Sequence, residues 1–414
     1  MRFLFLLLSF SLVSCISDLG SGKIDHRAWQ YLTEPPTHPA SYQPKFWIFF
    51  TDKAVTRYQT HEREQIEKQL HLQYHGSLSR RFQQRTPHWQ EEDYPVYGPY
   101  ITQVLALHPD LQLIEKSRWN NAISLRLPRA QRHTLLMQLS ELDCVKKIDL
   151  VAWQYRRATD QTKSQQTSRH LLDDSDSKYG DSWEQLAMID VPALHSRGYT
   201  GKDIMILILD SGFNLDHPAF RNMDIVDQYD FVNDDDNVTD QIFDEIENAD
   251  PEKHGTATLS TIGGWDEGKH YGPAFESRYL LGKTESMLIE DPVEEDYFIS
   301  ALEWGEALGA QIVTASLGYQ DWYTYEDKTG SALIDTTIDF LVEQRGVTVF
   351  VAVGNEQREN LGPGVPGDSL RALSIGAVSF NGDVASFSSQ GPTFDGRIKV
   401  SIYQMNWDGS QIFS

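Results

Sequence analysis

Three side chains that could take part in acyl transfer each stand next to a predicted secondary-structure element. Asp210 follows the continuous apolar run Ile204–Leu209, which is typical of a strand buried on both faces of a parallel sheet. His254 stands at the start of a small apolar helical segment, and Asn355 comes shortly after the apolar run Val347–Val353. In acyl transfer a carboxylate orients an imidazole, the imidazole takes a proton from a nucleophile, and an amide donates to the oxyanion. The three residues therefore supply three parts of an acyl-transfer site.

The segments around these residues alternate between strand and helix. Another apolar run at Gln311–Ala315 predicts a strand, and helical spacing predicts helices over residues 298–308 and 333–344. Apolar strands that alternate with helices favour an α/β fold with a doubly wound parallel sheet. Such folds place their functional groups at the carboxyl ends of the strands, which is where Asp210 and Asn355 stand.

Several motifs in this part of the chain resemble those of the subtilisin-like serine proteases, the subtilases of peptidase family S8. The resemblance covers about residues 179–399. The motifs, in chain order, are Ile208-Leu209-Asp210-Ser211-Gly212 with Asp216-His217-Pro218, His254-Gly255-Thr256, Ser316-Leu317-Gly318, Ala352-Val353-Gly354-Asn355 and Phe387-Ser388-Ser389-Gln390-Gly391-Pro392. Because several motifs agree in order and in spacing, the resemblance is far more specific than any one short pattern.

The resemblance implies a role for each motif. Asp210 and His254 would be the acidic and basic members of a catalytic triad, and Asn355 would be an oxyanion donor. The segment Ser316–Gly318 would bind an extended peptide substrate by strand addition. The implied reaction is peptide-bond hydrolysis by a serine-type endopeptidase acting on protein or peptide substrates, with no cofactor required for the chemistry.

One part of the family's site is missing from the sequence. The nucleophilic serine of subtilases stands in a Gly-Thr-Ser motif, and the only Gly-Thr here is Gly255-Thr256, which belongs to the histidine motif. Residues 400–414 depart from the family's pattern, and Ser410 has only four residues after it. We therefore expect a chain that is truncated at its C-terminus and inactive as it stands. The alternative is a non-catalytic protein of the same fold, which binds peptides or a partner without cleaving them.

The net charge differs in sign between two segments of the chain. Residues 45–170 carry a net charge of +6 and residues 171–414 carry −30, which suggests separate domains that attract one another. The strand and helix pattern of residues 45–155 is compatible with a small α+β, ferredoxin-like domain. By the resemblance this domain is the protein's own propeptide, which blocks the peptidase domain at 179–414 until it is cleaved. The polar residues 156–178 between them are predicted to be a linker.

The first 15 residues resemble an export signal of the lipoprotein type. Arg2 precedes an apolar run that is too short to span a bilayer, and this run ends in Leu12-Val13-Ser14-Cys15. That ending resembles the lipobox of bacterial lipoproteins, in which the cysteine is lipidated after cleavage. We therefore expect an exported protein that is anchored to a membrane of the bacterial cell envelope through Cys15. The alternative is an ordinary cleavable signal that happens to contain a cysteine.

Composition and charge bear on two further possible binding partners, nucleic acid and calcium. The total charge of −24 argues against nucleic acid, because most of the surface would repel phosphate. Twelve acidic residues and no Lys or Arg lie in Asp224–Glu252. Subtilases often bind calcium, and an oxygen-rich loop such as Asn233–Asn237 could supply ligands for a structural calcium ion. The spacing has no defined calcium-loop pattern, so a solvated acidic surface loop is the competing interpretation.

Overall fold

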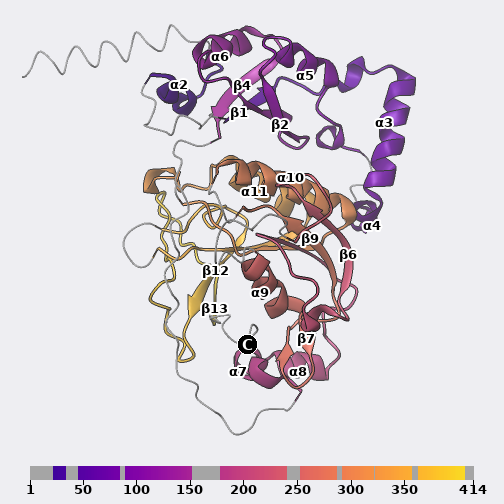
Figure 1. The fold of residues 1–414 in the computed structure, drawn as a ribbon, viewed down its shortest axis with the longest axis vertical. Helices are drawn as coiled ribbons and strands as arrows, with labels where there is room; N and C mark the ends of the chain where they lie inside the picture. The colour runs from indigo at the N-terminus through magenta and orange to yellow at the C-terminus, as the bar shows by residue number, and fades with distance from the viewer. Residues whose placement is uncertain are drawn as a thin grey trace, which may run out of the picture. The chain divides into compact units, whose positions relative to one another are not determined.

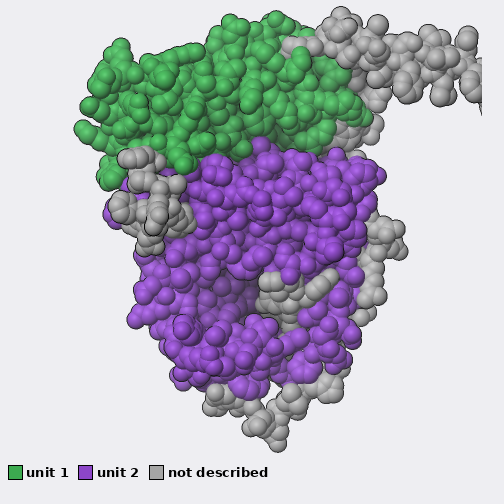
Figure 2. Space-filling view, turned by 180° about the vertical axis from the view of Figure 1, so that it is seen from behind, with its two compact units in different colours: residues 1–72, 88–155 green, residues 73–87, 156–414 purple. Residues whose placement is uncertain are grey.

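The computed structural model describes residues 22–33, 45–83, 89–151, 178–239, 252–286, 291–320, 322–356 and 362–405. The chain divides into two units, which Figure 2 shows in different colours. Unit 1 comprises residues 1–72 and 88–155, and unit 2 comprises residues 73–87 and 156–414. The export signal with Cys15 and nearly all of the predicted linker lie outside the described residues.

Unit 1 is built around a four-stranded antiparallel sheet with the strand order β2-β3-β1-β4. Its strands are β1 (Lys45–Phe50), β2 (Gln112–Ser117), β3 (Ala122–Arg126) and β4 (Val145–Leu150). The helices in this part of the chain are α2 (His26–Thr33), α3 (Thr60–Gln73), α5 (Gly98–Leu105) and α6 (Arg132–Glu141). Leu135, Leu136 and Leu139 of α6 share one buried core with Phe46 and Ile48 of β1. This sheet order and helix packing confirm the predicted ferredoxin-like α+β domain.

Unit 2 contains a seven-stranded sheet whose neighbouring strands are all paired in parallel. In spatial order the strands are β13 (Ile402–Met405), β12 (Leu373–Val378), β11 (Thr348–Ala352), β10 (Ile312–Ala315), β5 (Met205–Asp210), β9 (Arg278–Lys283) and β6 (Asp224–Asp230). The three strands predicted from apolar runs are the neighbours β11, β10 and β5, and every residue of β5 is buried. Sequence analysis did not predict β6, because its sequence DIVDQYD contains three aspartates.

Helices cover both faces of this sheet, as the prediction of a doubly wound arrangement requires (Figure 1). The helices α10 (Val293–Leu308) and α11 (Leu333–Arg345) lie on one side, and α9 (Glu252–Gly263) lies on the other. Both α10 and α11 end at a glycine of positive φ, Gly309 at 102° and Gly346 at 64°. Glycine is the usual residue there because a Cβ strains this conformation.

Shorter elements complete the described chain. They are α4 (His75–Gln83), α7 (Trp183–Met188), α8 (Val191–Ser196), the paired strands β7 (Trp265–Asp266) and β8 (His270–Tyr271), and the 3₁₀ turns Val55–Arg57, Glu91–Asp93, Gly180–Ser182, Pro218–Phe220 and Tyr325–Asp327. No helix of the described ranges has the length and apolar character needed to cross a membrane.

The acidic segment Asp224–Glu252 begins as a strand rather than as a loop. Asp230, the last residue of β6, is fully buried, and its Oδ2 lies 3.0 Å from Nζ of Lys283, whose side chain is only 3% exposed. The backbone N–H groups of Val232 and Asn233 also donate to Asp230. The interpretation as a solvated loop is therefore wrong for this carboxylate, because a buried charge needs a partner and β9 supplies one. Residues 240–251 of the segment lie outside the described residues.

Candidate active site

Asp210 and His254 are brought together at the carboxyl edge of the parallel sheet. Asp210 is the last residue of β5 and its side chain is completely buried, whereas the side chain of His254, in the first turn of α9, is 46% exposed. Oδ1 of Asp210 lies 2.6 Å from Nδ1 of His254, so a short charge-assisted hydrogen bond joins them. Because this bond engages Nδ1, the other ring nitrogen, Nε2, is the one that can exchange a proton with a nucleophile.

Three further donors hold the carboxylate of Asp210. The backbone N–H and the hydroxyl of Ser211 donate to Oδ1 at 2.7 and 3.2 Å, and the hydroxyl of Thr258 donates to Oδ2 at 2.9 Å. Thr258 lies one turn after His254 on α9, so the helix that carries the imidazole also fixes its carboxylate partner. Both oxygens are therefore satisfied, which an ionised carboxylate requires away from water.

A close backbone approach lets α9 reach the loop that follows β5. A Cβ on Gly255 would stand 2.1 Å from the carbonyl oxygen of Gly212 and 3.1 Å from Cβ of Asp210, so only glycine fits there. Gly212 itself has a φ of 137°, which lies in the region that favours glycine. The glycines of the aspartate and histidine motifs thus have a packing role, because they allow His254 to come within hydrogen-bonding distance of Asp210.

The pKa of His254 is raised from its ordinary value of 6.5 to about 9. The negative charge of Asp210 is the largest cause. Burial opposes it, whereas the hydrogen bond that His254 donates to Asp210 and the charge of Glu285 also raise the pKa. Glu285 is nearly buried and accepts a hydrogen bond of 2.6 Å from the hydroxyl of Tyr319. In this arrangement the imidazolium is the favoured form at neutral pH.

Two other predicted motifs follow β10, which is next to β5, and β11, which is next to β10. Because β10 pairs in register with both β5 and β11, the three strands end at the same edge of the sheet. Ser316, Leu317 and Gly318 follow β10, and Asn355 lies three residues after β11. Ser316, Gly318 and Asn355 are exposed, whereas Leu317 is buried. The sheet therefore brings the predicted motifs to one edge, and the roles of Asn355 and of the segment 316–318 stay predictions.

Sequence analysis missed two polar residues at this edge. Thr258 is one, although its helical spacing from His254 could have indicated it. The other is Gln320, whose Nε2 would stand 2.9 Å from a Cβ on Gly354 and 1.3 Å from a Cβ on Gly364. Lys328 donates to Oε1 of Gln320 at 2.8 Å. Nε2 of Gln320 is buried without a hydrogen-bond partner among the described residues. No sequence motif indicates Gln320, because chain folding alone brings it to these glycines.

Three serines of the motifs donate their hydroxyl hydrogen bonds to other groups than His254. Ser211 donates to Asp210, Ser388 donates to the carbonyl oxygen of Ser389, and Ser389 donates to Oε2 of Glu356 at 2.9 Å. Within the described ranges, no serine is hydrogen-bonded to the imidazole of His254. The described chain therefore shows the acid and the base of an acyl-transfer site without a serine beside them.

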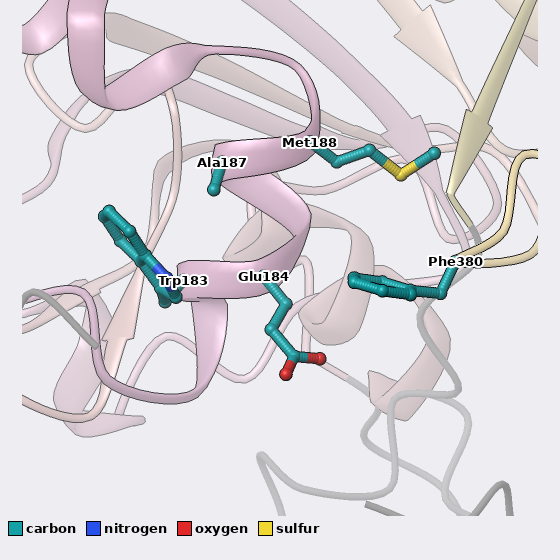
Figure 3. Close-up of a pocket in the computed structure, with 5 residues that line it drawn as sticks. All are labelled: Trp183, Glu184, Ala187, Met188 and Phe380. Atoms are coloured by element: carbon teal, nitrogen blue, oxygen red, sulfur yellow. The ribbon is translucent and has the colours of Figure 1, made fainter. Parts of the chain in front are cut away.

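In the described part of the chain, neither a metal-ligand group nor the pocket at α7 adds to the Asp210–His254 site. Across the described residues, no group of three or more His, Cys, Asp or Glu side chains is arranged to hold a metal ion. A surface pocket is lined by Trp183, Glu184, Ala187 and Met188 of α7 and by Phe380 (Figure 3). Met188 and Phe380 are exposed. None of the predicted site residues lines this pocket.

The fold and the site together define a class of protein. The protein is of the α/β class, because helices cover both faces of its parallel sheet. At the carboxyl edge of the sheet, a buried aspartate and a histidine form the Asp–His part of an acyl-transfer site. The family model for the subtilase family, peptidase S8, matches residues 201–406. The model for the peptidase S8 propeptide domain of Bacteroidota matches residues 45–169. The chain therefore belongs to the subtilisin-like serine proteases and carries their propeptide domain, as the motifs implied.

Individual relatives agree with this assignment. The subtilisin of Bacillus pumilus is 27% identical over 217 residues, which are 51% of this chain and 69% of that protein. Subtilisin E of Bacillus subtilis (strain 168) is 27% identical over 217 residues, so the chain spans 50% of its length. The crystal structure of the epidermin leader peptide processing serine protease from Staphylococcus aureus has a TM-score of 0.52 and 12% identity, over 88% of this chain and 76% of that one. At that identity the likeness concerns the fold alone.

Proposed function

We propose that this chain is the proform of an exported, subtilisin-like serine endopeptidase in which Asp210 and His254 are the acid and the base. The proposal depends above all on the hydrogen bond of 2.6 Å between Oδ1 of Asp210 and Nδ1 of His254 at the carboxyl edge of the sheet. A propeptide domain at residues 45–169 ahead of a peptidase domain at 201–406 is the order expected of a proform.

In the proposed reaction the peptide substrate extends along Ser316–Gly318. Asp210 holds Nδ1–H of His254. In the neutral form of His254, Nε2 takes the proton of a serine hydroxyl, Asp210 stabilises the imidazolium that forms, and Nε2 then gives the proton to the leaving amine. The side-chain amide of Asn355 donates to the oxyanion, and loss of one such donor typically lowers turnover by about 10²–10³. These steps use side chains and need no metal or cofactor.

The sequence does not contain the motif that carries the nucleophilic serine in subtilases. No Gly-Thr-Ser occurs in the 414 residues, so we propose that this chain by itself does not hydrolyse peptides. Without a hydroxyl beside His254, no acyl-enzyme can form. The same missing motif supports the second candidate function, a non-catalytic protein that binds peptides or a partner through the subtilisin-like fold.

The proposal also includes a location. The ending Leu12-Val13-Ser14-Cys15 after an apolar run supports export and lipid anchoring at Cys15, which would place the protein on a membrane of the bacterial cell envelope. Several acyl chains together hold a protein firmly at a membrane, whereas one chain binds weakly.

Hydrolysis of casein by the purified chain tests the catalytic part of the proposal. We expect no hydrolysis that depends on His254, so wild type, His254→Ala and the exposed control His61→Ala should give the same background. Hydrolysis that His254→Ala removes and a serine-directed phosphonate blocks would overturn the proposed inactivity and support another serine as the nucleophile.

Sequencing the DNA past codon 414 separates the two candidate functions. A coding stretch that contains Gly-Thr-Ser in any frame would support the endopeptidase. If no such stretch follows, the non-catalytic binding protein is favoured.

A further inference from the structure

The short helix α4 (His75–Gln83) belongs to unit 2, although it lies in the chain between β1 and β2 of unit 1. Its residues fall inside the matched propeptide domain, whereas the helix that it contacts, α10, falls inside the matched subtilase domain. Figure 1 shows α4 beside α10. The propeptide domain thus contributes a helix to the compact unit of the peptidase.

The backbones of the two helices touch at a glycine. A Cβ on Gly76 would stand 2.0 Å from the carbonyl oxygen of Leu308 and 2.9 Å from the backbone nitrogen of Gly309. A Cβ on Gly309 would in turn stand 3.1 Å from Cα of Gly76. No side chain larger than a hydrogen atom fits between these backbones, so the contact fixes where α4 lies along α10.

A buried ion pair joins the same two helices. Nε of Arg81 lies 3.0 Å from Oε1 of Glu306, and its Nη2 lies 2.7 Å from Oε2. The two side chains are only 4% and 0% exposed. A guanidinium that binds both oxygens of one carboxylate recognises the geometry as well as the charge. Removal of either residue would take away the bidentate partner of the other buried charge, which is strongly unfavourable.

We propose that α4 is the docking helix by which the propeptide domain recognises its own peptidase domain. Its receptor is the C-terminal end of α10, with Glu306 as the charge partner of Arg81 and with Leu308 and Gly309 as the backbone surface for Gly76. The contact lies outside the Asp210–His254 site and needs no hydrolysis, so it holds the propeptide after the linker is cut. Because the ion pair is buried, salt screens it far less than the exposed charges of the two domains.

The test uses the full chain with a recognition sequence for a site-specific endopeptidase inserted within residues 156–178. After the cut, size-exclusion chromatography in 0.1 and 1 M NaCl shows whether the two fragments stay together. We expect the wild-type fragments to elute together at both salt concentrations. In Arg81→Ala the dissociation constant should rise on the order of 10²-fold or more, because the buried Glu306 loses the guanidinium that binds both of its oxygens.

Gly76→Ala tests the backbone contact without a change of charge. Helix propensity alone would favour alanine in α4, so weaker binding would have to come from the clash with Leu308. Two matched controls should bind as the wild type does. Gly98→Ala adds a Cβ where nothing lies within 4 Å, and Arg63→Ala removes an exposed ion pair with Glu67 on α3.

Charge reversal distinguishes recognition from a general folding defect. Arg81→Glu and Glu306→Arg should each separate the fragments, and the double variant should restore much of the binding. In the intact chain, hydrogen exchange should show faster exchange of the α4 amides in Arg81→Ala, with β1 unchanged. Fragments of Arg81→Ala that bind as tightly as wild type, or a double reversal that binds no better than either single variant, would overturn the proposal. Either result would leave the proposed peptidase function untouched.

Discussion

Thr258 donates a hydrogen bond of 2.9 Å to Oδ2 of Asp210, the oxygen that His254 does not use. The two oxygens of this buried carboxylate therefore bind different groups. Oδ1 accepts from the imidazole of His254, and Oδ2 accepts from Thr258 on the helix that carries His254. This division fixes the plane of the carboxylate before any substrate is bound.

Thr258→Val should lower the free energy of unfolding by about 1–3 kcal/mol, because it leaves Oδ2 of Asp210 buried without a donor. Denaturant unfolding at pH 7 measures the change. Thr261→Val is the matched control on the same helix, because the exposed hydroxyl of Thr261 donates only to the backbone carbonyl of Thr258. We expect the control to stay within about 0.5 kcal/mol of wild type. Equal effects of the two substitutions would contradict this account.

The raised pKa of His254 makes stability depend on pH in a defined direction. A base with a higher pKa in the folded state stabilises the fold fully below its unfolded value near 6.5, and this contribution is lost as the pH rises through about 9. The free energy of unfolding of wild type should therefore fall between pH 6.5 and 9 relative to that of His254→Ala. Solvent screening will reduce the size of the change, because the imidazole is 46% exposed.

Asp210→Asn should lower the pKa of His254 towards its ordinary value, because the charge of Asp210 is the largest cause of the shift. An NMR titration of the His254 ring follows this directly, and Glu343→Gln, an exposed acid paired with Arg371, is the control. An unchanged His254 pKa in Asp210→Asn would contradict this account, because it would show that the charge of Asp210 does not raise the pKa.

Two ion pairs that link the same strands, β6 and β9, should differ in their contribution to stability. Lys283→Met leaves Asp230 buried without its cation and should cost about 3–5 kcal/mol. Arg278→Met removes the exposed pair with Asp224 and should cost at most about 1 kcal/mol. Thermal or denaturant unfolding of both variants gives the comparison. A small effect of Lys283→Met would mean that the hydrogen bonds from Val232 and Asn233 suffice to stabilise Asp230.

Cys15→Ala should release the protein from the membrane fraction of cells that express the full chain. The lipobox-like ending at Cys15 motivates this prediction, since only a cysteine can carry the thioether-linked lipid. Ser14→Ala keeps the cysteine and should remain in the membrane fraction. If Cys15→Ala fractionates as wild type does, the signal is of the ordinary cleavable type.

Local sequence was sufficient for the central part of the fold and for the pair of residues at its edge. Apolar runs long enough to be buried on both faces predicted β5, β10 and β11, because burial in a parallel sheet imposes that composition. The resemblance of the motifs around Asp210 and His254 to those of subtilases predicted that the two residues meet. The structure adds that Gly212 and Gly255, which belong to the same motifs, permit this contact. Polar strands such as β6 gave no such signal.

Tertiary structure decided the contacts between residues that no local pattern connects. Asp230 lies in an acidic stretch that a solvated loop would explain equally well, and only its pairing with Lys283 shows that it is buried. Arg81 and Glu306 are 225 residues apart, so neither has a neighbour in the sequence that indicates its partner. The physical reason is common to both cases. A charge looks the same in a sequence whether it is solvated or buried, and the environment that separates the two is created only when distant segments pack together.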